Sequence, residues 1–183
     1  MKKLFSILLS IFLISTFSNA AKLIPKKIQE GNIPKKLARI EIPFVKNMGQ
    51  QNKAVKFYAK TFGGTLFITK NGNLVYSLPK FRDKKIEGGV ALREIFKGAK
   101  IEQIKGLEKS LAKVNYFIGK DKNKWKTNLE TFNVISLGEI YKGIEVKLKA
   151  YGNNVEKIFK IKPKSNPEKI VIKFEGAKEL KID

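Results

Sequence analysis

The residue types that carry most enzyme chemistry are scarce in this sequence. It contains no cysteine and no histidine, which excludes Ser-His-Asp catalysis, Cys-His catalysis and histidine-based metal sites. Asp121 and Asn123 offer oxygen ligands for a cation. Lysines interrupt the alternating acids and amides that a calcium loop needs, so we expect no metal site there.

Glu139 and Glu145 are the remaining candidates for acid–base chemistry. They lie on different expected elements, and nothing in the sequence fixes their separation at the distance that glycoside hydrolysis requires. The Gly-Gly pairs at 63–64 and 88–89 lack the strand-to-helix context of a phosphate-binding loop. We therefore expect a non-enzymatic protein with no catalytic residue and no cofactor. An exported hydrolase that uses carboxylates alone is the enzymatic alternative.

The first twenty residues predict export from the cytoplasm. Lys2 and Lys3 precede an apolar segment at 4–17, and Ser18-Asn19-Ala20 has the small residues of a cleavage site. The alternative is a membrane anchor, but a spanning helix needs about 20 apolar residues. We expect a periplasmic, cell-surface or extracellular protein that does not span the membrane after cleavage and does not meet intracellular nucleic acid.

The net charge of +22 suggests a polyanionic partner. Only Arg39, Arg82 and Arg93 are arginines, however, and phosphate sites favour the guanidinium fork. Lysines spaced singly along strands are typical of a solvated face that resists aggregation. Such lysines are Lys147, Lys149, Lys157, Lys160, Lys162 and Lys173. Two hypotheses remain: a solvated lysine surface, or binding to an anionic envelope polymer or glycan.

Residues 21–42 are the least globular part of the chain. They contain two copies of Ile-Pro-Lys-Lys, at 24–27 and 33–36, and each proline biases its neighbourhood to extended backbone. We expect an extended basic arm or linker, with a tether to an anionic surface as the alternative. The folded domain is expected to cover 43–183.

From Val55 onward, β-branched and aromatic residues alternate with lysines at a period of two, which is typical of strands. Asn71-Gly72 predicts a tight hairpin turn, and Gly152-Asn153-Asn154 predicts a second one. The predicted strands cover 55–59, 65–69, 74–78, 90–96, 114–118, 132–137, 144–151, 155–161 and 170–174. Strands this short and this regularly spaced predict an all-β antiparallel β-sandwich.

Three local features complete this interpretation. In 144–151, Ile144, Val146, Leu148 and Ala150 are expected to point inward. Residues 138–142 are expected to form a turn. The segment around 107–113 fits either a helical turn or an irregular loop.

Aromatic, glycine and turn residues recur across the domain at distinctive spacings. They are Phe44, Asn47, Gly49 and Gln50, then Asn115, Tyr116, Phe117, Gly119, Trp125, Thr127 and Asn128, then Tyr141, Gly143, Pro167, Phe174 and Gly176. With these residues the sequence resembles the N-terminal domain of unknown function in secreted bacterial SBBP-repeat proteins, where it precedes a β-propeller-type repeat region. It departs from that pattern at 157–158, where an aromatic and an acid are usual.

The resemblance implies an architectural or interaction domain of a cell-envelope or extracellular protein. Its implied partner is a β-propeller region encoded downstream or another envelope protein. The alternative is a polyanion- or glycan-binding module that acts through surface lysines and aromatics.

We expect the motif residues to be structural. Trp125 is interpreted as a core or corner-plugging aromatic, with a stacking platform for a sugar or partner as the alternative. Gly49 is expected to set a turn whose backbone is satisfied by the amides of Asn47 and Gln50, with a polar binding patch as the alternative. Near the end of the chain, 170–174 and 180–182 predict an unpaired strand edge that is available to another polypeptide.

The first prediction concerns processing. Cleavage is expected between Ala20 and Ala21, because small residues stand at Ser18 and Ala20. N-terminal sequencing of the exported protein should begin at Ala21. A mature protein that begins at Met1 would contradict the prediction.

Overall fold

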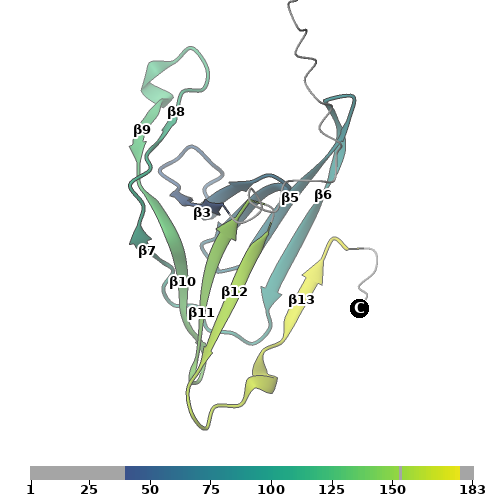
Figure 1. Cartoon of the computed structure of the whole chain (residues 1–183), viewed down its shortest axis with the longest axis vertical. Coiled ribbons are helices and arrows are strands. Elements are labelled where there is room, and N and C mark those ends of the chain that lie inside the picture. Colours follow the sequence, from purple (N-terminus) through teal and green to yellow (C-terminus); the bar gives the residue numbers. More distant parts are fainter. Residues whose placement is uncertain (1–39, 153, 178–183) are drawn as a thin grey trace, which may run out of the picture. The chain divides into compact units, whose positions relative to one another are not determined.

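The computed structural model describes residues 40–152 and 154–177, which form an antiparallel all-β architecture (Figure 1). The expected signal peptide and the arm up to Arg39 lie outside the described residues. The strands are β1 (Glu41–Ile42), β2 (Phe44–Lys46), β3 (Val55–Thr61), β4 (Gly64–Thr69), β5 (Leu74–Arg82), β6 (Lys85–Phe96), β7 (Lys105–Lys109), β8 (Val114–Tyr116), β9 (Lys126–Leu129), β10 (Thr131–Tyr141), β11 (Ile144–Tyr151), β12 (Val155–Ile161) and β13 (Ile172–Glu175). Two 3₁₀ turns are η1 (Lys122–Lys124) and η2 (Pro167–Lys169). The predicted all-β class is confirmed.

Eleven of these strands form one hydrogen-bonded sheet, in the order β1-β11-β10-β2-β3-β4-β5-β6-β13, with β12 on β11 and β7 on β10. Strands β8 and β9 form a separate two-stranded sheet. The short strand β2 connects the two halves of the large sheet by pairing with β10 and β3, while β1 pairs with β11. Sheet pairing therefore begins at Glu41, so the last residues of the expected arm belong to the sheet.

The two halves of the sheet enclose one core, as expected for a sandwich. Ile144, Val146, Leu148 and Ala150 of β11 are fully buried, which confirms the predicted inward face. Val146, Leu148 and Ala150 join one apolar cluster with residues of β3, β4 and β5 from the other half. The sandwich is thus one continuous sheet whose two halves face each other across the buried side chains.

Two aromatic pairs link the halves across this core. Phe57 of β3 meets Phe132 of β10 edge to face, with 5.8 Å between ring centroids. Phe96 of β6 meets Phe159 of β12 with 6.2 Å between centroids. Edge-to-face contacts add about 0.5–1.5 kcal/mol beyond the burial of the rings. The first pair therefore helps to hold β3 against β10, and the second helps to hold β6 against β12.

One lysine expected on the solvated face points into the sandwich instead. Lys157 is the register partner of the buried Leu148, and its Nζ lies 3.1 Å from Oε1 and 3.0 Å from Oε2 of Glu94 on β6. Only the contact with Oε1 has hydrogen-bond geometry, so Oε2 is held by charge alone. Because Glu94 is only 5% exposed, this pair joins the halves at a site largely withdrawn from water.

The neighbouring Tyr76 reports on the same environment. Burial raises the pKa of the Tyr76 phenol above its ordinary value, and the nearby Glu94 carboxylate raises it further. The phenol therefore stays neutral beside the carboxylate at all ordinary pH values.

Three predicted boundaries were wrong. β6 begins at Lys85 and runs through Gly88 and Gly89, because cross-strand pairing with β5 outweighs the weak strand preference of glycine. Residues 105–109 form β7, which pairs with β10 where a helical turn or a loop was expected. β10 continues through Gly138, and a register shift there absorbs its positive φ of 77°.

Within the described ranges, no helix is long and apolar enough to span a membrane.

The second prediction tests the buried ion pair. Lys157→Ala leaves the Glu94 carboxylate buried without its cation and should cost about 3 kcal/mol or more in the free energy of unfolding. The double variant Glu94→Leu/Lys157→Met should be about as stable as the parent, because two apolar groups need no compensation. Urea unfolding measures both values. A loss below about 1 kcal/mol in Lys157→Ala would mean that the pair contributes no more than an exposed one.

Candidate interaction surface

The hairpin of β5 and β6 continues well beyond the core. Leu74 at its base is buried, but between Ser77 and Ala91 only Pro79 is half-buried and every other side chain is exposed. Figure 1 shows this hairpin reaching out at the upper right. We call residues 77–91 the projecting hairpin. Its two strands stay paired to the tip, so the hairpin is held by its own hydrogen bonds and not by core packing.

The projecting hairpin carries large apolar side chains on both faces. Leu78 pairs with Val90, at 39% and 52% exposure, and Phe81 pairs with Ile86, at 51% and 67%. Because side chains alternate along a strand, Leu78 continues the face that buries Leu74, and Phe81 lies on the opposite face. A register shift between Lys80 and Phe81 pairs Ile86 with Phe81. Grouped apolar exposure of this kind is typical of a surface that contacts another molecule.

Charged residues surround the apolar pairs, and the positive ones are in excess. The basic residues are Lys80, Arg82, Lys84 and Lys85, and the acids are Asp83 and Glu87. Arg82 and Glu87 pair with each other at 3.5 Å, which leaves three lysines against one aspartate. This surface therefore favours a partner that is apolar and acidic.

Strand β6 also presents part of its backbone edge. β13 pairs with it from Arg93 to Phe96, and no other strand among the described residues covers the edge of β6 from Lys85 to Leu92. A row of unpaired backbone groups is a template for an added strand. The described residues thus leave an edge of β6 uncovered beside β13. The predicted unpaired edge at the end of the chain is a different one and stays a prediction. Residues 180–182 lie outside the described part.

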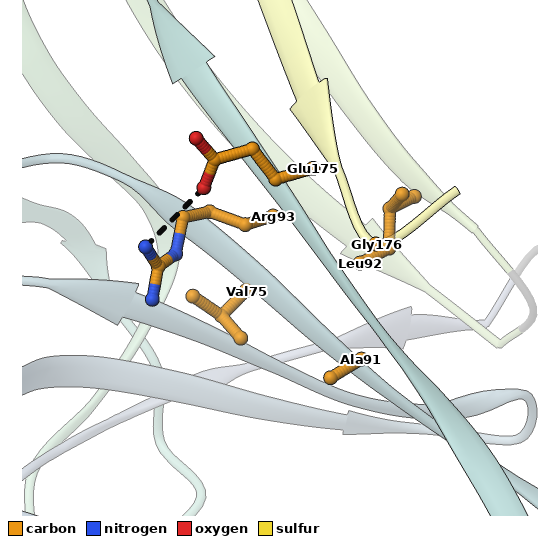
Figure 2. Close-up of a pocket in the computed structure, with 6 residues that line it drawn as sticks. All are labelled: Val75, Ala91, Leu92, Arg93, Glu175 and Gly176. Atoms are coloured by element: carbon orange, nitrogen blue, oxygen red, sulfur yellow. Dashed lines mark hydrogen bonds and ion pairs between the residues drawn. The ribbon is translucent and has the colours of Figure 1, made fainter. Parts of the chain in front are cut away.

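A shallow hollow of about 260 Å³ lies where β13 meets β6, at the base of the projecting hairpin. Figure 2 shows Val75 and Ala91 in its lining beside an ion pair between Arg93 and Glu175, whose atoms Nη1 and Oε2 are 3.4 Å apart. Lys173 binds the other oxygen of Glu175 at 2.7 Å. Lys173, with a smaller effect of Arg93, holds the pKa of the Glu175 carboxyl below its ordinary value. The ionised carboxylate ties β13 to β6.

The turn between β2 and β3 is built as the sequence predicted. Asn47 Oδ1 accepts hydrogen bonds from the backbone N–H groups of Gly49 and Gln51, both at 3.0 Å. Its Nδ2 donates to the carbonyls of Asn52 at 3.0 Å and Val55 at 2.9 Å.

The side-chain amide of Gln50 also satisfies backbone groups of this turn. Gln50 Oε1 accepts from Met48 N at 2.7 Å, and its Nε2 donates to Lys46 O at 2.8 Å. Gly49 has a φ of 104°, in the region that favours glycine. The interpretation of Asn47, Gly49 and Gln50 as a self-satisfied turn is confirmed.

Of the two structural roles predicted for Trp125, the structure shows the corner-plugging one and not the core one. Trp125 is half-buried and lies beside the small β8–β9 sheet. Its ring packs edge to face on Phe117 at 5.2 Å, its Nε1 donates to Gly119 O at 3.1 Å, and Lys122 Nζ lies 5.9 Å from the ring centre. The tryptophan thus plugs the end of the β8–β9 hairpin, away from Val114, Tyr116 and Leu129, through which the hairpin packs on the large sheet.

The rest of that motif block braces the same hairpin and joins it to the sheet. Asn115 Oδ1 accepts from Asn128 N at 2.9 Å, while Thr127 is exposed on β9. Tyr116 packs on a second apolar cluster built around Tyr58, on the outer side of β2 and β3. Burial raises the pKa of the Tyr58 phenol, and the amides of Gln50 and Gln51 oppose this effect. The first two motif blocks, separate in sequence, therefore meet at one place in the fold.

The remaining motif residues lie elsewhere. Phe44 is fully buried in the core. Tyr141 donates to Lys97 O at 2.9 Å and fastens the β6–β7 loop. Pro167 begins η2, and Phe174 is half-buried on β13, two residues before Gly176. The sixteen predicted residues therefore form several structural clusters and no single pocket.

The structure brings together the two carboxylates whose separation the sequence left open. Glu139 and Glu145 are register partners on β10 and β11. Lys162 Nζ lies 2.6 Å from Glu139 and 4.0 Å from Glu145. The Gly143 N–H, followed by Lys162, holds the pKa of Glu139 below its ordinary value, so this carboxylate is poorly suited to donate a proton. Elsewhere in the described chain, no group of three or more acids is placed to hold a metal ion.

Sequence reasoning missed the projecting hairpin. The predicted strands stopped at Leu78 and resumed at Val90, because Pro79 and the Gly88-Gly89 pair are typical strand breakers. A signal was present in the even spacing of apolar residues on both sides of Asp83-Lys84. Both turn residues have positive φ, 47° and 64°, as a two-residue hairpin turn requires.

These features define a class: a small antiparallel β module with one exposed apolar hairpin and an uncovered strand edge. The chain belongs to the DUF7948 family, a domain of unknown function, whose family model matches residues 44–183. No curated protein and no solved structure gives a significant match. A domain of unknown function is thus confirmed over nearly the predicted range, and the link to SBBP-repeat proteins stays a prediction.

The third prediction concerns the β2–β3 turn. Asn47→Ala removes two acceptor and two donor contacts. A typical hydrogen bond contributes about 1 kcal/mol, and water replaces some of the lost bonds, so the free energy of unfolding should fall by about 2–3 kcal/mol. Asn52→Ala is the matched control, because its side chain caps only Ala54 N. Urea unfolding should show a loss below about 1 kcal/mol for the control. Equal losses in the two variants would contradict the role of Asn47.

Proposed function

We propose that this protein is a non-enzymatic interaction module that binds another polypeptide through the projecting hairpin. The observation that carries the proposal is the exposure of Leu78, Phe81, Ile86 and Val90 on a segment that contributes nothing to the core. Exposed apolar side chains do not stabilise the fold of the isolated chain, because only a second molecule can bury them. The gain is therefore expected at an interface.

Strand addition along β6 is the mode of binding that fits these features. An extended segment laid against Lys85–Leu92 would satisfy the unpaired backbone groups. Its alternate side chains would contact Phe81 and Ile86 on one face and Leu78 and Val90 on the other. Acidic residues in that segment would match the basic excess of the hairpin.

We further propose that the module is exported and belongs to the SBBP-repeat type of cell-envelope or extracellular protein. The signal-peptide pattern at 1–20 and the motif resemblance support this. On this proposal the partner is a β-propeller repeat region or another envelope protein, and the domain has an architectural role. The absence of histidine and cysteine from the chain supports a non-catalytic role.

The fourth prediction tests the hairpin as a binding surface. A photoreactive phenylalanine analogue at position 81 should cross-link to one discrete partner protein in the native cell envelope. Leu111, which is 99% exposed and lies outside the hairpin, is the matched control position and should give no such product. The adduct at 81 should disappear when Leu78→Ser and Val90→Ser are added.

A stability measurement separates binding from folding. The double variant Phe81→Ser/Ile86→Ser should unfold within about 0.5 kcal/mol of the parent, as surface substitutions usually do. Cross-linking of equal yield and pattern at 81 and 111, or none at 81, would contradict the proposal.

A further inference from the structure

A second feature lies away from the projecting hairpin, where the β10–β11 turn meets the loop between β12 and η2. These segments enclose an open hollow of about 570 Å³. Four lysine side chains line it: Lys142 from the β10–β11 turn, and Lys162, Lys164 and Lys169 from the loop and η2. All four are exposed.

The backbone holds these lysines in a fixed arrangement. Lys162 N donates to Gly143 O at 2.9 Å, and Ser165 N donates to Lys162 O at 3.1 Å. Gly143 has a φ of 76°, and a Cβ at this position would collide with the side chain of Ser165. The turn and the loop therefore approach each other as closely as glycine allows, which fixes the spacing between Lys142 and the other three lysines.

The only acid in the lining is already neutralised. Glu139 accepts hydrogen bonds from Gly143 N at 2.9 Å and from Lys162 Nζ at 2.6 Å. Lys142, Lys164 and Lys169 make no ion pair with any carboxylate of the described residues. Three lysines without an acidic partner among the described residues thus line one hollow, and Ser165 and Asn166 share its lining.

We propose that this lysine hollow binds a linear polyanion that carries repeated phosphate, sulfate or carboxylate groups. An ammonium group is a point charge without the paired donors of arginine, so charge density along a chain suits it better than one anion held at two points. The open shape of the hollow also fits a polymer that passes over it. Apart from Pro163, the lining has no apolar side chain, which argues against insertion into a bilayer.

The solvated-lysine hypothesis is the competing explanation, and location separates the two. A polymer attracted by net charge alone responds equally to the loss of any exposed lysines. A polymer bound at the hollow responds only to the loss of the hollow lysines. The inference is independent of the projecting hairpin, so either proposal can fail without the other.

The fifth prediction applies this contrast to the full chain. The hollow variant is Lys142→Gln/Lys164→Gln/Lys169→Gln. The control variant is Lys53→Gln/Lys113→Gln/Lys120→Gln, which removes the same charge from exposed sites in the β2–β3 turn and around β8 and η1. Thermal unfolding should show that both variants fold like the parent, because all six side chains are exposed.

Binding is measured by titration with labelled polyphosphate, dextran sulfate and polygalacturonate over a range of salt concentrations. The hollow variant should bind about tenfold or more weakly, and the slope of log K against log salt should fall by about 2–3, close to one for each lost contact. The control should change affinity by less than about twofold. The polymer bound most tightly identifies the preferred anionic group.

Three outcomes would overturn the inference. They are an equal loss of affinity in the two variants, no binding of any polymer at low salt, and binding only to vesicles of phosphatidylglycerol. The first assigns binding to net charge, the second removes it, and the third assigns the lysines to a membrane surface.

Discussion

Burial of one face of β11 against the opposite half of the sheet is the interaction on which the rest of this structure depends. With no cysteine in the chain, no disulfide can hold the halves together, so closure depends on apolar packing. Ile144, Val146 and Leu148 are completely buried, and each contributes about 1.5–3 kcal/mol when removed from water. β2 makes this possible, because it pairs with β10 of one half and β3 of the other and lets one sheet fold across its own core.

Because the two halves of the sheet close on each other, lysines on the outward and inward faces of its strands have different roles. Lys147, Lys149 and Lys160 lie on outward strand positions, where lysines keep a sheet soluble. Lys157 instead lies on the inward face of β12 and is compensated by Glu94. A charge there requires an opposite charge on the facing strand, so β12 and β6 are matched by electrostatics as well as by shape.

In the β5–β6 hairpin, the residues that stabilise the fold and the residues that form an exposed surface lie in different parts. The first residues of β5 and the last of β6 belong to the core, while the remainder continues outward on backbone pairing alone. This arrangement lets exposed apolar side chains vary without damage to folding, since they make no core contact. The lysine hollow has the same property: the backbone of Gly143 and Ser165 shapes it, and the exposed lysines supply its charge. In both places a rigid support carries side chains that are free to serve binding.

The sequence by itself determined the strand class, the inward face of β11 and the β2–β3 turn, because each depends on residues close together in the chain. Alternation sets the face of a strand, and Asn47 satisfies backbone groups within eight residues of itself. Tertiary structure decided the rest. Lys157 and Glu94 are 63 residues apart. Lys142 and Lys169 line one hollow only because the turn and the loop pack together. Trp125 lies outside the core because its hairpin packs on the sheet through other residues. Such pairings depend on how the two halves of the sheet close on each other. Local sequence patterns do not show which residues far apart in the chain this closure brings together.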